Sequence, residues 1–194
     1  MNQIQVCLVG DSKTGKSTYL YHLLHNKFQY EYQPTIGVDF NTIYREDNEI
    51  WKFWDTSGNS RFSSITTSYF KSKKLFLLFF DLNNYNSFHS TTNWITNINS
   101  FCNLKDYKII LVGNKNDLNP AVTDLDINTV CNKFSLRYVS ISIKNRINIT
   151  ELENIIKSNL SLPINNINVK NNDYVRLLDN DDNLKSKCCQ CVIL

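Results

Sequence analysis

The residues of this chain that could do chemistry gather in short segments, each directly after an apolar run. Residues 10–17 read GDSKTGKS, the spacing of a loop that cradles phosphate groups between a strand and a helix. In such a loop the backbone N–H groups and the helix N-terminus face the phosphates. Lys16 would reach the β and γ phosphates, and the Ser17 hydroxyl would bind Mg²⁺. The flanking strand and helix favour this interpretation over a chance match in a tight turn.

A second segment, DTSGNSRF at residues 55–62, follows the strand-like run EIWKFW. An acidic residue at the end of a strand, with Gly three positions later, is typical of the place where some nucleotide enzymes sense a terminal phosphate. Asn59 follows that Gly. The segment therefore raises the question of whether a short amide still lets such an enzyme cut its nucleotide, or only bind it.

A third segment, NKND at residues 114–117, ends another apolar strand. The carboxylate of Asp117 can accept hydrogen bonds from the N1–H and exocyclic amine of guanine, donors that adenine lacks. Alone the segment is a weak signal, because Asn and Asp are common in turns. About a hundred residues after a phosphate loop it predicts a base-specificity element. Ser142, Ile143 and Lys144 would close the other side of the base.

The elements that must position these segments alternate along the chain, which predicts an α/β fold with a mostly parallel sheet covered on both faces. The expected strands are residues 4–10, 38–46, 49–55, 74–81, 108–114 and 137–142, the second and third forming a hairpin around Asp47-Asn48. The expected helices are residues 16–25, 88–101, 122–134 and 149–160. The five glycines, Gly10, Gly15, Gly37, Gly58 and Gly113, all lie at or beside strand ends, where open α/β sheets bind ligands.

The 194 residues suit one domain, which we expect over residues 1–162, followed by an Asn- and Asp-rich flexible tail over 163–194. The formal net charge of +3 is too small to argue for nucleic acid. No apolar stretch approaches the ~18 residues that span a bilayer, and the N-terminus resembles no secretory leader. Six cysteines without a disulfide framework are typical of a cytosolic protein, and Cys7, Cys102 and Cys131 are expected to be buried thiols.

With these motifs in this order, the chain resembles a Ras-superfamily small GTPase, and within it the Rab family. The nucleotide motifs of that family are occupied by GDSKTGKS, Thr35, DTSG, NKND and SIK, and the Rab branch is indicated by IGVDF, WKFW, RFSSIT, YFK and FDL. The resemblance covers residues 4–160 and the final cysteines. It implies the P-loop small-GTPase fold, with six strands and five helices, and a Mg²⁺-dependent GDP/GTP switch that regulates vesicle and membrane traffic.

The resemblance also implies roles for single residues. Thr35 would coordinate Mg²⁺ only in the GTP state, Asp55 would hold the ion through water, and the Gly58 amide would meet the γ-phosphate. Phe28 would pack against the guanine. The implied nucleotide-binding set is Gly10, Asp11, Ser12, Lys13, Thr14, Gly15, Lys16, Ser17, Thr18, Phe28, Thr35, Gly58, Asn114, Lys115, Asp117, Ser142, Ile143 and Lys144. The implied catalytic residues are Lys16 and Asn59, and the implied effector region is Ile36, Gly37, Val38, Asp39 and Phe40.

Several residues depart from the pattern of the family. Lys13 and Thr14 replace a Gly-Val pair, Ser57 replaces Ala, Ser60 replaces Glu, Ile143 replaces Ala, and Asn59 replaces Gln. Because Asn is one methylene shorter than Gln, we expect slow hydrolysis with intact binding. The alternatives are an effector-binding module with negligible hydrolysis and a signalling GTPase of another Ras branch. A P-loop kinase is disfavoured, because NKND and DTSG stand in GTPase order.

The chain ends in CCQCVIL, of which CVIL fits a C-a-a-X prenylation signal whose terminal Leu favours geranylgeranyl at Cys191. A three-cysteine metal site is the alternative, and it lacks a fourth ligand. Cys188 and Cys189 are candidates for palmitoylation or a second prenyl group, since one chain often needs a second signal. We expect a monomer anchored by lipid to the cytoplasmic face of a membrane, with a cytosolic pool. Its implied partners are an exchange factor, a GTPase-activating protein, effectors and a prenyl-binding escort, and no nucleic acid.

Overall fold

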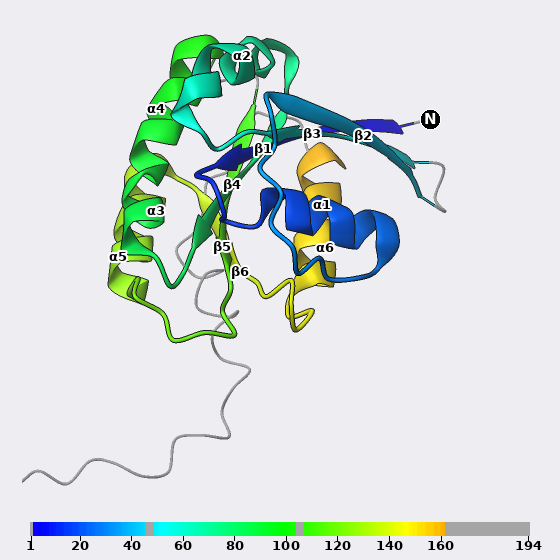
Figure 1. Ribbon diagram of the computed structural model, residues 1–194. Coiled ribbons are helices and arrows are strands. Elements are labelled where there is room, and N and C mark those ends of the chain that lie inside the picture. The colour runs from blue at the N-terminus through cyan, green and yellow to red at the C-terminus, as the bar shows by residue number, and fades with distance from the viewer. Residues whose placement is uncertain (1, 46–48, 104–106, 162–194) are drawn as a thin grey trace, which may run out of the picture.

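The sheet has the topology that the alternating pattern predicts. The computed structural model describes residues 2–45, 49–103 and 107–161, and within them six strands run in the order β2-β3-β1-β4-β5-β6 (Figure 1). The strands are β1 (Asn2–Gly10), β2 (Val38–Tyr44), β3 (Glu49–Thr56), β4 (Leu75–Asp81), β5 (Lys108–Asn114) and β6 (Arg137–Ser140). β2 pairs with β3 antiparallel, and the other pairs are parallel. The predicted hairpin is confirmed, although its Asp47-Asn48 turn lies outside the described residues.

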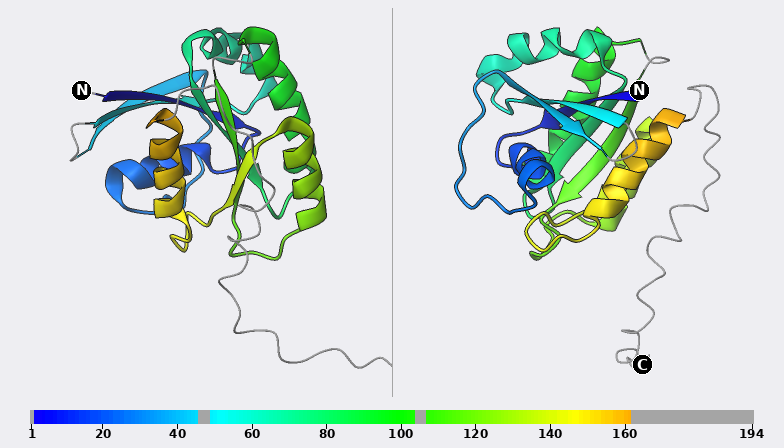
Figure 2. Two further views of the ribbon diagram at one scale, coloured as in Figure 1. Left: turned by 180° about the vertical axis from the view of Figure 1, so that it is seen from behind. Right: turned by 90° about the vertical axis from the view of Figure 1, so that its right-hand side faces the viewer.

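Helices cover both faces of the sheet (Figures 1 and 2). The α-helices of the described residues are α1 (Lys16–His25), α2 (Ser63–Ser68), α3 (Tyr85–His89), α4 (Thr91–Phe101), α5 (Asp124–Phe134) and α6 (Ile149–Ser161). Single 3₁₀ turns span Ser60–Phe62 and Phe70–Ser72. The predicted helix 88–101 is divided at Ser90 into α3 and α4, so the described residues form six α-helices where the resemblance implies five. Sequence reasoning missed α2, because SSITTS is short and has no apolar period.

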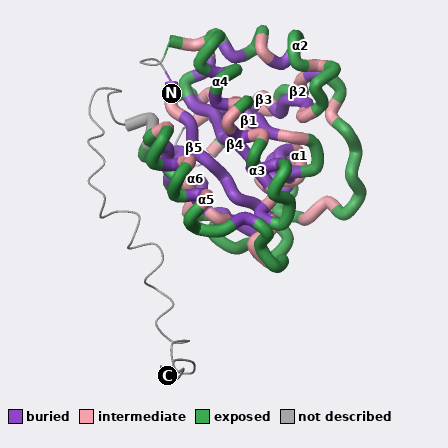
Figure 3. The backbone as a smooth tube through the Cα atoms, turned by 90° about the vertical axis from the view of Figure 1, so that its left-hand side faces the viewer, coloured by how far each residue is buried: buried purple, intermediate pink, exposed green. Residues whose placement is uncertain are grey.

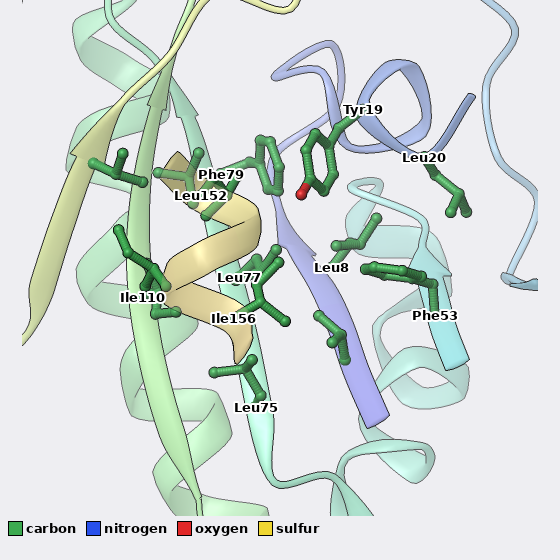
Figure 4. Packing of buried hydrophobic residues seen from close by; sticks show 14 of the residues in the cluster. Leu8, Tyr19, Leu20, Phe53, Leu75, Leu77, Phe79, Ile110, Leu152 and Ile156 are labelled. Carbon is green, nitrogen blue, oxygen red and sulfur yellow. The ribbon is translucent and has the colours of Figure 1, made fainter. Parts of the chain in front are cut away.

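The core forms two layers, one on each face of the sheet, because successive strand residues point to opposite sides. Val6 and Leu8 of β1 pack toward α1 and α6, whereas Cys7 and Val9 pack toward α3, α4 and α5. In the first layer the ring of Tyr19 lies 5.6 Å from that of Phe79, with Leu152 of α6 near Phe79 and Ile156 of α6 near Leu77 (Figure 4). Figure 3 shows the buried strands between exposed helix surfaces.

Most of the apolar residues of β3 and β4 pack in the core. The first six residues of β4, LFLLFF, are all buried, which explains why that run shows no alternation. Trp51 and Phe53 are also fully buried. Cys7 and Cys131 are buried as expected, but Cys102 is only half-buried, with its thiol directed to the Phe70 carbonyl oxygen at 3.3 Å.

The carboxyl ends of the parallel strands position the predicted site. β1, β3 and β5 end at Gly10, Thr56 and Asn114. The segments 10–17, 55–62 and 114–117 each begin at or next to one of these strand ends. Because these strands are parallel, their carboxyl ends lie at one edge of the sheet. β6 ends at Ser140, two residues earlier than predicted, because Ser142 leaves the ladder to pair with Ile147. No helix of the described residues is long and apolar enough to cross a membrane.

Candidate nucleotide site

The phosphate loop wraps around the ammonium group of Lys16. Its Nζ donates to the backbone oxygens of Gly10 at 2.8 Å and Asp11 at 2.7 Å, and the residue is buried. Burial lowers the pKa of the Lys16 ammonium to about 8, and the negative charges of Asp55 and Asp11 partly raise it again. Gly15 closes the loop in a left-handed conformation, where an added Cβ would lie 2.1 Å from Asn114 Nδ2. The loop therefore presents a cation and helix N–H groups, the donors that phosphates need.

The three predicted metal ligands converge beside this loop. The Ser17 hydroxyl donates to Asp55 Oδ2 at 2.6 Å, Thr35 Oγ1 donates to the same oxygen at 3.2 Å, and the two hydroxyl oxygens are 2.9 Å apart. Asp55 Oδ1 is buried and has no hydrogen-bond partner among the described residues. Burial raises the pKa of the Asp55 carboxyl, and the hydrogen bond from Ser17 lowers it in part.

These oxygens fit Mg²⁺. A small, hard divalent cation takes oxygen ligands and keeps several waters, so one carboxylate and two hydroxyls suit it better than a cage of protein carboxylates. In the described part of the chain no three His, Cys, Asp or Glu residues gather into a metal site. The buried, unpartnered oxygen of Asp55 is the observation that favours a cation here, because such an oxygen is costly without a partner.

The residues of the predicted base-specificity segment are held in place by hydrogen bonds. Ser142 is fully buried and its hydroxyl donates to Asp117 Oδ1 at 2.5 Å, which fixes the orientation of the carboxylate. Asn114 Nδ2 donates to the Thr14 carbonyl oxygen at 2.9 Å and so holds the base segment against the phosphate loop. Lys115 Nζ pairs with Asp81 at 2.6 Å. Asp117 itself lines the pocket described next, where its carboxylate can accept hydrogen bonds from a ligand.

A pocket of about 550 Å³ joins the phosphate and base segments, a volume typical of small-molecule sites. Of the predicted residues it is lined by Ser12, Lys13, Gly15, Lys16, Ser17, Thr18, Phe28, Thr35, Ile36, Gly58, Asn59, Asn114, Lys115, Asp117, Ile143 and Lys144. Five predicted nucleotide and metal residues do not line the pocket: Gly10, Asp11, Thr14, Asp55 and Ser142. Each of them is hydrogen-bonded to a residue that does line the pocket.

The side chain of Asp11 faces away from the pocket. Its Oδ1 accepts a hydrogen bond from Trp94 Nε1 of α4 at 2.8 Å, and its backbone oxygen accepts from Lys16. Thr14 is buried, and its hydroxyl donates to that same backbone oxygen at 2.9 Å. Both residues therefore shape the loop.

Sequence reasoning missed other residues of the site. Tyr30 and Tyr32 line the pocket, and both are exposed. Their position between Phe28 and Thr35, two predicted site residues, was a sequence signal for this role. Ser57, Phe62 and Leu118 line it too. No local signal links Trp94 to Asp11.

Asn59 lines the pocket, but its amide oxygen is engaged elsewhere. Asn59 Oδ1 accepts the backbone N–H of Arg61 at 3.0 Å and caps the 3₁₀ turn Ser60–Phe62. Its backbone N–H donates to the Ser57 hydroxyl at 3.3 Å. Beside it the backbone of Gly58 lies against the phosphate loop, where an added Cβ would be 2.2 Å from the backbone nitrogen of Ser12.

The predicted effector region continues from the pocket onto an exposed apolar surface. Ile36 is 80% exposed and Phe40 is 50% exposed, and the Phe40 ring lies 4.9 Å from that of Trp54. The Gly37 carbonyl oxygen accepts the backbone N–H of Ser57 at 2.8 Å, which connects this region to the segment that carries Asn59. Exposed apolar surface of this kind marks protein interaction sites.

A phosphate-loop sequence, a cluster of hydroxyl and carboxylate oxygens and the predicted base-specificity segment meet at one edge of this sheet, the arrangement of a P-loop nucleotide-binding protein. The model of the Ras family matches residues 5–161. Ras-related protein Rab-27A of Rattus norvegicus is 32% identical over 163 residues, which cover 76% of this chain and 74% of that protein. Ras-related protein Rab-3D of Homo sapiens is 32% identical over 153 residues, covering 76% and 69%. Ras-related protein Rab-3 of Caenorhabditis elegans is 30% identical over 150 residues, covering 75% and 68%.

The chain belongs to the Ras family. With these relatives it is a Rab-like small GTPase, a GDP/GTP switch of the class that regulates vesicle traffic. The expected family and fold are confirmed.

Proposed function

We propose that this Rab-like GTPase binds GDP and GTP with Mg²⁺ in the 550 Å³ pocket and hydrolyses GTP slowly. The observation that carries the proposal is the hydrogen bond from the Arg61 N–H to Asn59 Oδ1, because it occupies the amide oxygen that hydrolysis needs. The protein would then remain in its GTP state longer than relatives with Gln at this position.

Nucleotide binding would rest on residues other than Asn59. The Lys16 ammonium and the loop N–H groups would contact the phosphates, and Asp117, oriented by Ser142, would accept the guanine donors. Ser17 and Thr35 would hold Mg²⁺ directly, with Asp55 holding it through water. When bound, the ion neutralises charge that develops on the phosphates.

Slow hydrolysis would follow from the position of one amide. In phosphoryl transfer, nearly all of the catalysis is positioning and charge stabilisation. The Asn59 side chain falls short of a Gln by on the order of 1 Å, and a misplacement of that size can cost ~10²-fold in rate. The hydrogen bond from the Arg61 N–H to Asn59 Oδ1 would also have to break before this oxygen could contact the attacking water. A GTPase-activating protein would restore the rate, since an arginine finger alone can add ~10³–10⁵.

Partner proteins would recognise the GTP state at the surface formed by Ile36, Gly37, Val38, Asp39 and Phe40. Thr35, a proposed Mg²⁺ ligand, directly precedes this surface, and Gly37 is bonded to Ser57 beside Gly58. Loss of the γ-phosphate would therefore loosen both segments together. Effectors, an exchange factor and a GTPase-activating protein would discriminate the two states there.

The membrane anchor would be a geranylgeranyl group on Cys191, after loss of Val192-Ile193-Leu194 and with methylation of the new end. Cys188 and Cys189 would supply a second lipid. These residues lie outside the described part of the chain, so the support for this step is the CVIL sequence alone. A prenyl-binding escort would maintain a cytosolic pool of monomer.

Nucleotide competition tests the binding half of the proposal. Bound fluorescent GDP should be displaced by unlabelled GDP and GTP, and only at far higher concentration by ATP. The Asp117→Asn variant should bind guanine nucleotides more weakly and accept xanthine nucleotides, because its amide offers a donor where the carboxylate only accepts. Equal competition by ATP and GTP in the unmodified protein would contradict the assignment of the base site.

A further inference from the structure

Lys13 joins the phosphate loop to the segment that spans the pocket. Its Nζ lies 5.6 Å from the centre of the Tyr32 ring, within the range of a cation–π contact. Both side chains line the pocket, and both are exposed at its mouth. The two residues come from different elements: Lys13 from the loop between β1 and α1, and Tyr32 from the segment between α1 and β2.

The backbone of Lys13 has a left-handed conformation, with φ of 67°. This conformation is unfavourable for a residue with a side chain and carries no penalty for Gly. A lysine is therefore held where glycine would fit without strain. Strain of this kind at a ligand site points to a role for the side chain.

The segment that carries Tyr32 is attached at both of its ends, and the Tyr30 ring packs edge-on against Phe28. At its start Phe28 packs against the core, and at its end Thr35 bonds with Ser17 and Asp55. Between them lies a stretch without regular secondary structure. The contact between Lys13 and Tyr32 connects the middle of this stretch to the phosphate loop.

We propose that Lys13 is a latch that retains the nucleotide. Resting on the function proposed above, its ammonium attracts the phosphates and at the same time holds Tyr32, so the segment between α1 and β2 stays closed over the pocket. Release of the nucleotide then requires this contact to open. Lys13 is thus a positioning residue that sets how long GDP or GTP stays bound.

The test is the rate at which fluorescent GDP leaves each variant when excess unlabelled GDP is added. Lys13→Met keeps the length of the side chain and the strained backbone but removes the charge. Tyr32→Leu removes the ring. Each should release GDP about 3- to 10-fold faster than the unmodified protein. In a Tyr32→Leu background, Lys13→Met should add a smaller factor than it does alone, because the contact is already lost.

Conservative variants separate the latch from a general effect on folding. Lys13→Arg keeps a cation and Tyr32→Phe keeps a ring, so both should retain slow release. Lys133 lies 5.1 Å from the Phe134 ring on α5 and does not line the pocket, so Lys133→Met is the matched control for loss of an exposed cation–π contact. The acceleration caused by Lys13→Met should also shrink at high salt, which screens exposed charges.

Two results would overturn the latch. Release from Lys13→Met at the rate of the unmodified protein would remove its basis, and so would an undiminished effect of Lys13→Met in the Tyr32→Leu background. In either case GDP would still bind, and the proposed function would stand. If the unmodified protein failed to hold GDP at all, the proposed function and the latch would both fail.

Discussion

The indole N–H of Trp94 donates a hydrogen bond to the carboxylate of Asp11 across 2.8 Å, which fastens α4 to the phosphate loop. The backbone oxygen of the same Asp11 accepts from the Lys16 ammonium. The loop is therefore bonded to α4 through Trp94, a residue that does not line the pocket.

Trp94→Phe should weaken nucleotide binding although the phosphate loop itself is unchanged. The variant keeps an apolar ring and leaves the partly buried Asp11 carboxylate without this donor. A hydrogen bond to a charged group contributes ~1.5–3 kcal/mol, and the partial exposure of Asp11 reduces this to about 1 kcal/mol. The Kd for GDP should rise about 5-fold in titration calorimetry. An unchanged Kd would show that the loop keeps its shape without α4.

The proposed Mg²⁺ site predicts an effect of metal removal. A chelator should accelerate GDP release from the unmodified protein on the order of tenfold or more, because Ser17 and Asp55 would hold an ion whose charge stabilises the phosphates. In Asp55→Asn the release should already be fast, and the chelator should change it little. A fluorescent GDP dissociation assay with and without chelator compares the two proteins. Equal sensitivity of both proteins would remove Asp55 from the metal site.

The residues of the phosphate loop and base segment could be predicted because each motif is contiguous and each follows a strand. Lys16, Ser17, Asn114 and Asp117 therefore needed only the alternation of strands and helices to bring them together. The contact of Trp94 with Asp11 could not be predicted, because it joins residues 83 positions apart through the packing of α4. Local sequence therefore identifies the residues that line the site, whereas tertiary packing determines which distant residues hold the phosphate loop in place.

The hydrogen bond of the Asn59 side chain could not be predicted from the sequence either. Its identity predicted a short side chain, but only the structure shows that its oxygen caps the turn that begins at Ser60. The early end of β6 is similar. Ile141 donates to the Gly113 carbonyl oxygen and accepts from the Asn116 N–H, so the chain turns there to place Ser142 beneath Asp117. Apolar periodicity carries no information about such bonds.

The proposed membrane anchor predicts the mass and the location of the protein. Native protein should lack Val192-Ile193-Leu194 and carry a geranylgeranyl group and a methyl ester on Cys191, as read by mass spectrometry. Cys191→Ser should be found in the soluble fraction of cells, because its prenyl acceptor is gone. A protein with a free C-terminus should be used for both. Membrane attachment of Cys191→Ser at the level of the unmodified protein would contradict the anchor.

The most direct test of the account compares hydrolysis by the unmodified protein with hydrolysis by Asn59→Gln. Both proteins are loaded with GTP, and release of the γ-phosphate is followed in a single turnover, with GTP affinity measured alongside. Gln extends the amide by one methylene, so its oxygen can reach the attacking water. We predict equal GTP affinity, slow hydrolysis by the unmodified protein, and acceleration in Asn59→Gln by up to ~10²-fold. Equal rates of phosphate release from the two proteins would show that residue 59 does not limit hydrolysis.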